Sequence, residues 1–314
     1  MKEFAYQRAA DIRDALIAGG GGARYLAGGT NLVDLMKEGV EAPTRLIDVR
    51  RLPLDGISEA ADGALVIGAT TTNSDLAAHP EVRRRYPALS QAVLAGASGQ
   101  LRNMATVGGN LLQRTRCAYF AAQECNKRVP GTGCPAIAGA HHNHAILGWT
   151  RSCVATHASD MAVALTAFDA IVRYETLDGA GEIPLSEFYP PVGDTPHVET
   201  ALPPGALITA VVLPGAAASP RSRYRKVRER ASYAFATVSI AAAFTEGSVR
   251  IALGGVASRP WRCRTAEAFL LDSPGSFRAA AEAELSAAEP LPGNGYKVTL
   301  ARNLIETVLK ELQP

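Results

Sequence analysis

Hydrophobic and polar residues follow helical and strand periods in turn along the chain, a pattern typical of mixed α/β proteins. In the first fifty residues this pattern predicts helices over 9–18 and 31–38, and strands over 24–26 and 45–49. The glycine run 19–22 should end the first helix, because glycine readily adopts the left-handed conformation found at helix ends. The chain therefore begins with a small β–α unit.

A second unit follows with the same mixture of periods. The pattern predicts a strand over 64–68, helices over 86–95 and 159–169, and a strand over 170–175. The hydroxyl-rich run that begins at Thr70 favours a helix start, since such side chains cap the first backbone N–H groups of a helix. These elements are expected to form a second lobe.

The remaining stretches define the expected domains. Residues 114–156 lack a period and form an irregular insertion, and the proline-rich passage 184–214 closes the first domain. Further elements are predicted as strands over 238–244 and 249–253 and as helices over 264–271, 277–287 and 296–312. The predicted domains are residues 1–216, with lobes of about 1–55 and 56–216, and residues 217–314.

The composition is that of an ordinary globular protein and excludes several classes of function. Of the 314 residues, 47% are hydrophobic and 20% charged, and the formal net charge of +2 gives no reason to expect nucleic-acid binding. No run approaches the roughly 20 apolar residues that a membrane span requires. The N-terminal residues have no apolar signal core, so assembly in the cytoplasm without a signal peptide of its own is expected.

Two glycine-rich loops carry the first candidate chemistry. The loop 27–31 (AGGTN) lies between a predicted strand and a predicted helix, and the loop 106–110 (TVGGN) combines a hydroxyl, two glycines and an amide again. Paired glycines let successive backbone N–H groups face an anion, so two such loops could clamp a diphosphate. Each loop alone is equally compatible with a plain tight turn. Neither matches G-x-G-x-x-G, so a Rossmann NAD site is not expected.

Four of the five cysteines form a second candidate site. They fall within 37 residues at the spacing C-x7-C-x8-C-x18-C, as Cys117, Cys125, Cys134 and Cys153. A tight cluster in a large chain indicates a metal site rather than a disulfide framework. The spacing is neither a zinc-finger pattern nor a common ferredoxin run. Four thiolates nonetheless satisfy a [4Fe–4S] cluster, and sulfur ligands favour iron–sulfur or zinc over hard cations.

The two loops, in this order and at this separation, resemble those of the FAD-binding subunits of the xanthine dehydrogenase and carbon monoxide dehydrogenase family. The resemblance extends to Ser159-Asp160 at a helix start and to the sequence ALGGVASRPW at 252–261, and it covers essentially the whole chain. It implies a mixed α/β protein with a two-lobed FAD-binding domain of the molybdenum-hydroxylase flavoprotein (PCMH-like) type. A smaller domain of one sheet and several helices would follow.

The resemblance also implies roles for individual residues. The diphosphate and ribityl cradle would consist of Leu26, Ala27, Gly28, Gly29, Thr30, Asn31, Leu32, Thr106, Gly108, Gly109 and Asn110. Asp160 matches a carboxylate that accepts hydrogen bonds from the flavin's hydroxylated chain, although it could simply start a helix. Ile208 matches an aliphatic position near the flavin and Lys226 a cation there. Lys226 lies in a charge run, 221–230, that is more typical of a solvated face or a subunit contact.

Most members of this family lack the cysteine-rich insertion. The sequence CNKRVPGTGCPA, followed by a fourth cysteine and THASD, resembles the iron–sulfur insertion of bacterial molybdenum aldehyde oxidoreductase flavoprotein subunits. A [4Fe–4S] cluster held by the four cysteines is implied, with zinc or unligated thiols as alternatives. Three histidines could supply a ligand but are expected to be exposed loop residues, namely His141, His142 and His144. Cys263 is expected to be half-buried and without a ligand role.

By resemblance, this chain is an electron-transfer subunit of a molybdenum-dependent aldehyde oxidoreductase. A large partner subunit with the molybdenum cofactor would oxidise the aldehyde. Electrons would pass through [2Fe–2S] centres of a small subunit to FAD and then to an external acceptor, within a heterotrimer. No catalytic side chain is expected in this chain, because neither a nucleophile–base arrangement nor paired carboxylates is legible.

Several alternatives stay open at this stage. The chain could serve a hydroxybenzoyl-CoA reductase-like or xanthine dehydrogenase-like complex, act as a self-contained flavin reductase, or be a zinc-stabilised, non-catalytic FAD-binding scaffold. The cluster could lie on the electron path or support a partner surface. Export together with a partner subunit would give a periplasmic location instead of a cytoplasmic one.

Overall fold

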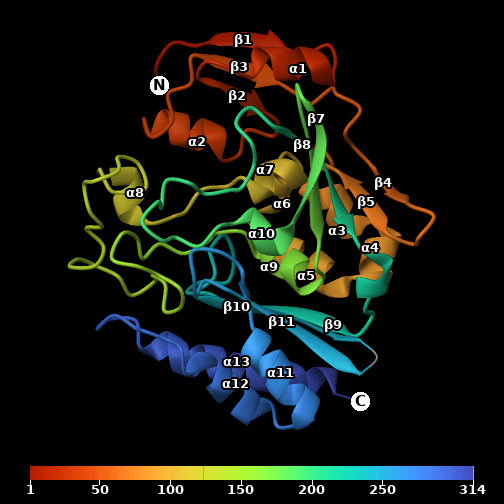
Figure 1. The fold of residues 1–314 in the computed structure, drawn as a ribbon, viewed down its shortest axis with the longest axis vertical. Helices are drawn as coiled ribbons and strands as arrows, with labels where there is room; N and C mark the ends of the chain where they lie inside the picture. The colour runs from red at the N-terminus through yellow and green to blue at the C-terminus, as the bar shows by residue number, and fades with distance from the viewer. Residues whose placement is uncertain (123, 246, 314) are drawn as a thin grey trace.

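The computed structural model describes residues 1–122, 124–245 and 247–313. Its three β-sheets follow one another along the longest axis of the molecule, each with helices packed against it (Figure 1). The mixed α/β architecture predicted from the sequence is confirmed.

The N-terminal lobe is a three-stranded parallel sheet, in the order β1-β3-β2, with two helices. Its elements are β1 (Ala5–Arg8), α1 (Ile12–Ala18), β2 (Ala23–Leu26), α2 (Leu32–Lys37) and β3 (Arg45–Asp48). Helix α1 begins later than predicted, because the Asp11 carboxylate caps it by accepting a hydrogen bond of 2.7 Å from the N–H of Asp14. Strand β1 was not predicted, since its exposed residues show no apolar alternation.

The central lobe is built on a five-stranded antiparallel sheet in the order β4-β5-β8-β6-β7. Its strands are β4 (Ile57–Glu59), β5 (Leu65–Gly68), β6 (Ile171–Thr176), β7 (Gly179–Pro184) and β8 (Leu207–Leu213). Its helices are α3 (Asn73–Ala78), α4 (Pro80–Arg85), α5 (Pro87–Ala95), α6 (Gly99–Arg102), α7 (Val107–Leu111), α9 (Asp160–Ala167) and α10 (Leu185–Phe188). Every residue of α9 is buried, so this helix forms the centre of the molecule.

Strand β8 lies in the middle of this sheet, although the proline-rich passage 184–214 predicted no strand. Pro203, Pro204 and Pro214 flank the strand, so none of them removes a hydrogen bond from its ladders. Between them the run LITAVVL is almost continuously apolar and buried, as expected for a strand covered on both faces. The strand was not predicted because the prolines, which bound it rather than interrupt it, dominate the pattern of this passage.

The C-terminal domain has a four-stranded antiparallel sheet, in the order β12-β11-β10-β9, with three helices on one face (Figure 1). After a 3-10 turn over Gly215–Ala217, its elements are β9 (Ser222–Val227), β10 (Val238–Thr245), β11 (Ser248–Gly254), β12 (Trp261–Arg262), α11 (Arg264–Asp272), α12 (Phe277–Leu285) and α13 (Tyr296–Leu312). The other face of the sheet packs on α5 and α9 of the central lobe.

Strand β9 occupies the charge run for which the sequence favoured a solvated face. Because side chains alternate along a strand, Arg223 and Arg225 lie on one face, where both pair with Glu311 of α13 at 2.8 Å. Tyr224 and Lys226 lie on the opposite face and are buried against the central lobe. The expectation of a solvated Lys226 is therefore wrong.

The cysteine segment, residues 114–156, is largely irregular, as predicted. Within its described residues the only helix is α8 (Ala118–Ala122). Two adjacent residues anchor the segment to different parts of the chain. The indole of Trp149 donates to the carbonyl of Glu289 at 2.7 Å, and the hydroxyl of Thr150 donates to the carbonyl of Gly193 at 2.8 Å. Across the described ranges of the chain, no helix is long and apolar enough to span a membrane.

Candidate functional site

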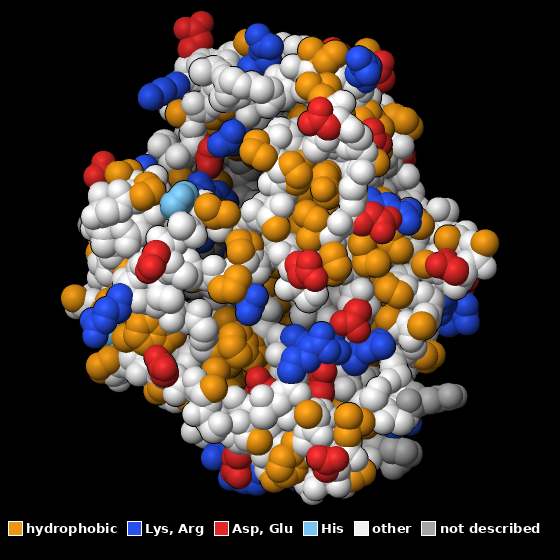
Figure 2. Space-filling view, in the orientation of Figure 1, with side chains coloured by type: hydrophobic (Ala, Val, Ile, Leu, Met, Phe, Trp, Pro, Cys, Tyr) orange, Lys and Arg blue, Asp and Glu red, His pale blue; other side chains and the backbone are white. Residues whose placement is uncertain are grey.

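A cavity of about 920 Å³ opens where the two lobes, the cysteine segment and the C-terminal domain meet. The space-filling surface is hollowed below the N-terminal lobe (Figure 2). Both glycine-rich loops reach the cavity. Its volume suits a ligand of cofactor size, since small-molecule pockets span about 300–1,000 Å³.

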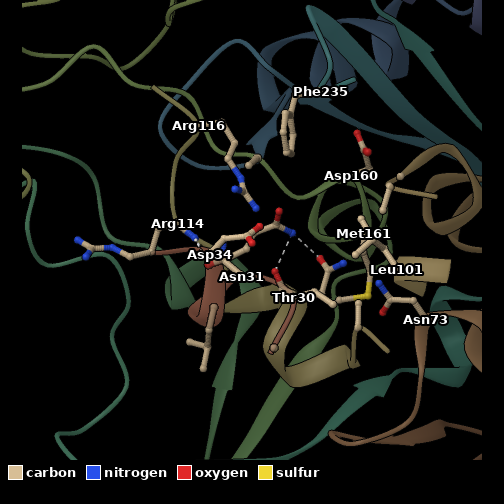
Figure 3. A pocket seen from close by; sticks show the side chains of 18 of the residues that line it. Thr30, Asn31, Asp34, Asn73, Leu101, Arg114, Arg116, Asp160, Met161 and Phe235 are labelled. Atoms are coloured by element: carbon tan, nitrogen blue, oxygen red, sulfur yellow. Dashed lines mark hydrogen bonds between the residues drawn. The ribbon is translucent and has the colours of Figure 1, made fainter. Parts of the chain in front are cut away.

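The labelled side chains converge on this space from several elements (Figure 3). Thr30 and Asn31 line one side of the cavity and Asp160 another. Arg116 reaches in from the cysteine segment, and its guanidinium stacks over the ring of Phe235 from the C-terminal domain, 5.1 Å from the ring centroid. Residues distant in sequence therefore share a single site.

The loop 27–31 rests directly on the backbone that leads to the second loop. A Cβ atom on Gly28 would lie 1.8 Å from the carbonyl oxygen of Met104 and 2.6 Å from its carbon, so only glycine permits this approach. Gly29 has a φ of +72°, in the left-handed region that glycine tolerates. The first loop is thus in backbone contact with residues 104–105, directly before the second loop.

The loop 106–110 forms the start of α7. The Thr106 hydroxyl accepts a hydrogen bond of 3.3 Å from the N–H of Gly109, and the N–H of Gly108 donates to the carbonyl of Ala69 at 2.8 Å. A Cβ atom on Gly109 would meet only the Thr106 hydroxyl, at 3.0 Å. Apart from this hydroxyl, the space around the Gly109 Cα is open, and Gly109 lines the cavity.

Four residues that line the cavity each carry a buried polar atom without a hydrogen-bond partner in the described structure. The atoms are Asn31 Nδ2, Thr70 Oγ1, Asn73 Oδ1 and His144 Nδ1. An unpaired buried polar group costs about 1–3 kcal/mol, which a ligand rich in hydroxyl, amide or phosphate groups would recover. The cavity therefore fits a polar, phosphate-bearing cofactor better than a purely apolar one.

A buried ion pair forms another part of the site. The Lys226 ammonium lies 2.7 Å from the Asp160 carboxylate, and the side chains are 3% and 9% exposed. The Tyr224 hydroxyl donates to the other carboxylate oxygen at 2.5 Å. Burial, followed by the Asp160 charge, raises the pKa of Tyr224 well above its ordinary value, so this phenol stays a hydrogen-bond donor. Ile208, 4% exposed, also lines the cavity.

Of the cofactor-binding residues predicted from the sequence, all but Leu26 line the cavity. Leu26 lies beneath the first loop, where its Cδ1 would be 3.3 Å from a Cβ atom on Gly29. The sequence missed Thr70, Asn73 and Tyr224. The hydroxyl-rich run containing Thr70 was interpreted only as a helix start, and a strand alternation across 222–227 was the available signal for Tyr224.

The four clustered cysteines gather around Cys117. Its half-buried side chain packs against three apolar clusters. One cluster contains Cys125, another contains Cys153, and Cys134 packs against the third. A hydrogen bond from Cys153, opposed by burial and assisted by backbone N–H groups, lowers the pKa of Cys134 to about 6. No group of three or more His, Cys, Asp or Glu side chains within residues 1–122, 124–245 and 247–313 is placed as a set of metal ligands.

His144 differs from the exposed loop residue that the sequence suggested. It is 8% exposed, and its Nε2 lies 3.1 Å from the sulfur of Cys117. The C-terminal domain fixes its backbone, because Asn294 and Lys297 both donate to its carbonyl, at 3.2 and 2.9 Å. Cys263, also predicted to be half-buried, is fully buried in the C-terminal core.

Comparison with known protein families identifies the family to which this chain belongs. Residues 2–216 match the model for the FAD binding domain in molybdopterin dehydrogenase, and residues 222–312 match the CO dehydrogenase flavoprotein C-terminal domain. The chain belongs to the FAD-binding subunits of the molybdenum hydroxylase family. It is the flavoprotein subunit of an oxidoreductase, as the resemblance of its loops predicted.

Individual relatives agree along the full length. The aldehyde oxidoreductase FAD-binding subunit PaoB of Escherichia coli (strain K12) is 51% identical over 317 residues, covering 99% of this chain and 98% of that protein. The carbon monoxide dehydrogenase medium chain of Afipia carboxidovorans is 28% identical, over 95% of this chain and 92% of that protein.

Solved structures confirm the fold. Carbon monoxide dehydrogenase from Hydrogenophaga pseudoflava superposes with a TM-score of 0.74 at 26% identity, covering 98% of this chain and 96% of that chain. Quinoline 2-oxidoreductase from Pseudomonas putida 86 superposes with a TM-score of 0.75 at 22% identity, covering 99% and 98%. Membership of this family identifies residues 2–216 as an FAD-binding domain.

Proposed function

We propose that this chain is the electron-transferring FAD subunit of a molybdenum-dependent aldehyde oxidoreductase. One observation carries the proposal: two glycine-rich loops, the first in backbone contact with the residues directly before the second, border a single cavity. The unpaired polar atoms of this cavity suit a phosphate- and hydroxyl-bearing cofactor. The 51% identity to an aldehyde oxidoreductase FAD-binding subunit supports an aldehyde as the substrate of the complex.

The FAD-binding residues are proposed as two sets. The diphosphate and ribityl chain would be held by Ala27, Gly28, Gly29, Thr30, Asn31, Leu32, Thr106, Gly108, Gly109 and Asn110, with Leu26 supporting the first loop from below. Asp160 would accept hydrogen bonds from the flavin's hydroxylated chain, and Ile208 and Lys226 would lie near the flavin. Bound FAD supplies exchange of one or two electrons, while these residues bind, orient and shield it. No side chain of the chain is assigned a catalytic role.

We further propose that Cys117, Cys125, Cys134 and Cys153 hold a [4Fe–4S] cluster. Their packing around Cys117 supports this assignment, because four thiolates complete the coordination of such a cluster. Cys117 and its neighbour Arg116 line the FAD cavity, so a cluster there would lie beside the flavin. The reduction potential of the cluster, compared with that of FAD, would show whether the cluster carries electrons or supports a partner surface.

The domain boundaries and partners complete the proposal. The FAD-binding domain would span residues 1–216, with lobes of about 1–55 and 56–216 and the insertion 114–156, and the C-terminal domain 217–314. In the proposed heterotrimer a large subunit carries the molybdenum cofactor and a small subunit carries [2Fe–2S] centres. This chain receives electrons from those centres and delivers them to an external acceptor.

Anaerobic mixing of the purified complex with benzaldehyde tests the function. The flavin absorbance is expected to fall when the aldehyde is added and to return when benzoquinone is added as acceptor. A flavin that stays oxidised while the aldehyde is consumed would remove this chain from the electron path. A preparation without flavin would overturn the proposal entirely.

Replacing Cys125 with serine is expected to remove bound iron while the flavin site still fills. A serine hydroxyl is a poor ligand for iron compared with a thiolate, so the cluster would lose one of its four attachments. The measurement is iron, sulfide and FAD content after anaerobic reconstitution in excess FAD. We expect loss of iron and sulfide with FAD still stoichiometric.

Cys263→Ala is the matched control, because Cys263 is buried in the C-terminal core and belongs to none of the three apolar clusters that pack against Cys117. It should retain iron. Iron retained by the Cys125 variant, or zinc found in place of iron in the unaltered protein, would contradict the cluster assignment.

A further inference from the structure

Arg114 stands at the junction between the second glycine-rich loop and the cysteine segment. Its backbone lies at the cavity, but its side chain points away from the space that the cofactor would fill (Figure 3). The role of this arginine must therefore come from what it holds in place rather than from contact with the flavin.

On the cofactor side, Arg114 fixes the first loop. Its backbone N–H donates to Asn31 Oδ1 at 3.2 Å, and its guanidinium pairs with Glu41, just beyond α2, at 2.7 Å. With Oδ1 occupied in this way, the amide of Asn31 presents its unpaired Nδ2 as a donor. Residue 114 thus sets which end of a cavity-lining amide is available to a ligand.

On the cysteine side, the same guanidinium holds the insertion. It stacks over the ring of Phe120 at 4.5 Å, and Phe120 packs with Cys125 and with Leu35 of α2. It also pairs with Glu199 at 2.6 Å, and Glu199 pairs with Lys127 at 2.5 Å. Lys127 lies between Cys125 and Cys134 in the sequence, so a chain of contacts runs from Asn31 to the cysteine segment.

This cluster of charges is enclosed. The side chains of Arg114, Lys127 and Glu199 are 20%, 9% and 25% exposed. Burial would raise the pKa of Glu199, but Lys127 and Arg114 together lower it, so the carboxylate stays ionised. The planar guanidinium bonds Glu41 and Glu199 from different nitrogens at once, which a lysine ammonium at this position cannot reproduce.

We propose that Arg114 is a positioning residue that couples the FAD cradle to the cysteine segment. Order imposed on the segment by its metal holds residue 114, and residue 114 in turn holds Asn31 in the orientation that FAD requires. Because such coupling is reciprocal, bound FAD also favours the metal-competent segment. The inference rests on the proposed function, since it needs both an FAD site and a metal-holding segment.

A double-mutant cycle in the assembled complex tests the coupling. In protein with Arg114, Cys125→Ser is expected to raise the Kd for FAD by about fivefold or more, the lower end of typical coupling between sites. In the Arg114→Lys background the same cysteine change should alter the Kd by less than about twofold. A purely structural arginine would lower stability but leave the two effects independent.

Arg173→Lys is the matched control, since Arg173 makes an exposed pair with Glu182 at 2.6 Å on the β6–β7 hairpin. In the Arg173→Lys background, Cys125→Ser should still raise the Kd for FAD by about fivefold or more. If Arg114→Lys does not fold, Glu199→Gln removes the link to Lys127 and completes the same cycle. Equal effects of the cysteine change in both backgrounds, or no effect in either, overturn the coupling. Failure of the unaltered complex to bind FAD would instead overturn the proposed function.

Discussion

Replacing Gly28 with alanine should weaken FAD binding strongly. The added Cβ would lie 1.8 Å from the carbonyl oxygen of Met104, and that contact is with backbone, so no side chain can move aside. The loop 27–31 would have to separate from the stretch before the loop 106–110. Overpacking of this kind costs about 1–3 kcal/mol, which corresponds to roughly 5- to 150-fold weaker binding if it falls on the cofactor site.

Gly20→Ala provides the control for Gly28→Ala. A Cβ atom on Gly20 meets nothing within 4 Å, and Gly20 lies in the same lobe at the end of α1. FAD titration of both variants, with circular dichroism to show that each is folded, gives the comparison. FAD affinity unchanged by Gly28→Ala would mean that the two loops do not act as one cradle.

Replacing Lys226 with methionine should destabilise the protein strongly and empty the flavin site. The Asp160 carboxylate would keep Tyr224 as a donor but lose its cation at 2.7 Å, while remaining 9% exposed. Removing one partner of a buried ion pair typically costs about 3–5 kcal/mol. Urea unfolding of the variant should show a loss of this size, and FAD should be absent from the purified protein.

Two further variants separate the ion pair from general packing. Arg173→Met breaks an exposed pair, which is worth about 0–1 kcal/mol, and should leave FAD bound. The double variant Asp160→Asn with Lys226→Met removes both charges and should recover part of the lost stability but not the FAD affinity. Full FAD retention by Lys226→Met would exclude this pair from the flavin site.

The sequence predicted those elements whose apolar period is strong and local. Helix α13 appears with the predicted bounds, and β10, β11 and α5 differ only at their ends. Strand β8 was missed because the prolines around it dominated the local pattern, and β9 because its charged face was interpreted without its buried face. Strand β8 pairs with β5 and β6, and the buried face of β9 packs against α5, so both depend on contacts that are distant in the sequence.

The candidate site shows the same limit. Glycine-rich loops can be recognised from composition alone. The predicted cradle was built from two such loops, and all of its residues except Leu26 line the cavity. Asn73, Thr70 and Tyr224 carry no such mark, because their position at the cavity depends on how α3 and β9 pack. His144 was judged from its loop context, and its burial beside Cys117 arises from contacts with Asn294 and Lys297, some 150 residues further along the chain.

The structure of the FAD-loaded protein tests the central claim most directly. The diphosphate is predicted to lie between the two glycine-rich loops, within hydrogen-bonding reach of backbone N–H groups from both, with the flavin end toward Asp160 and Lys226. A diphosphate bound by only one loop, or a flavin seated outside the cavity, would contradict the account.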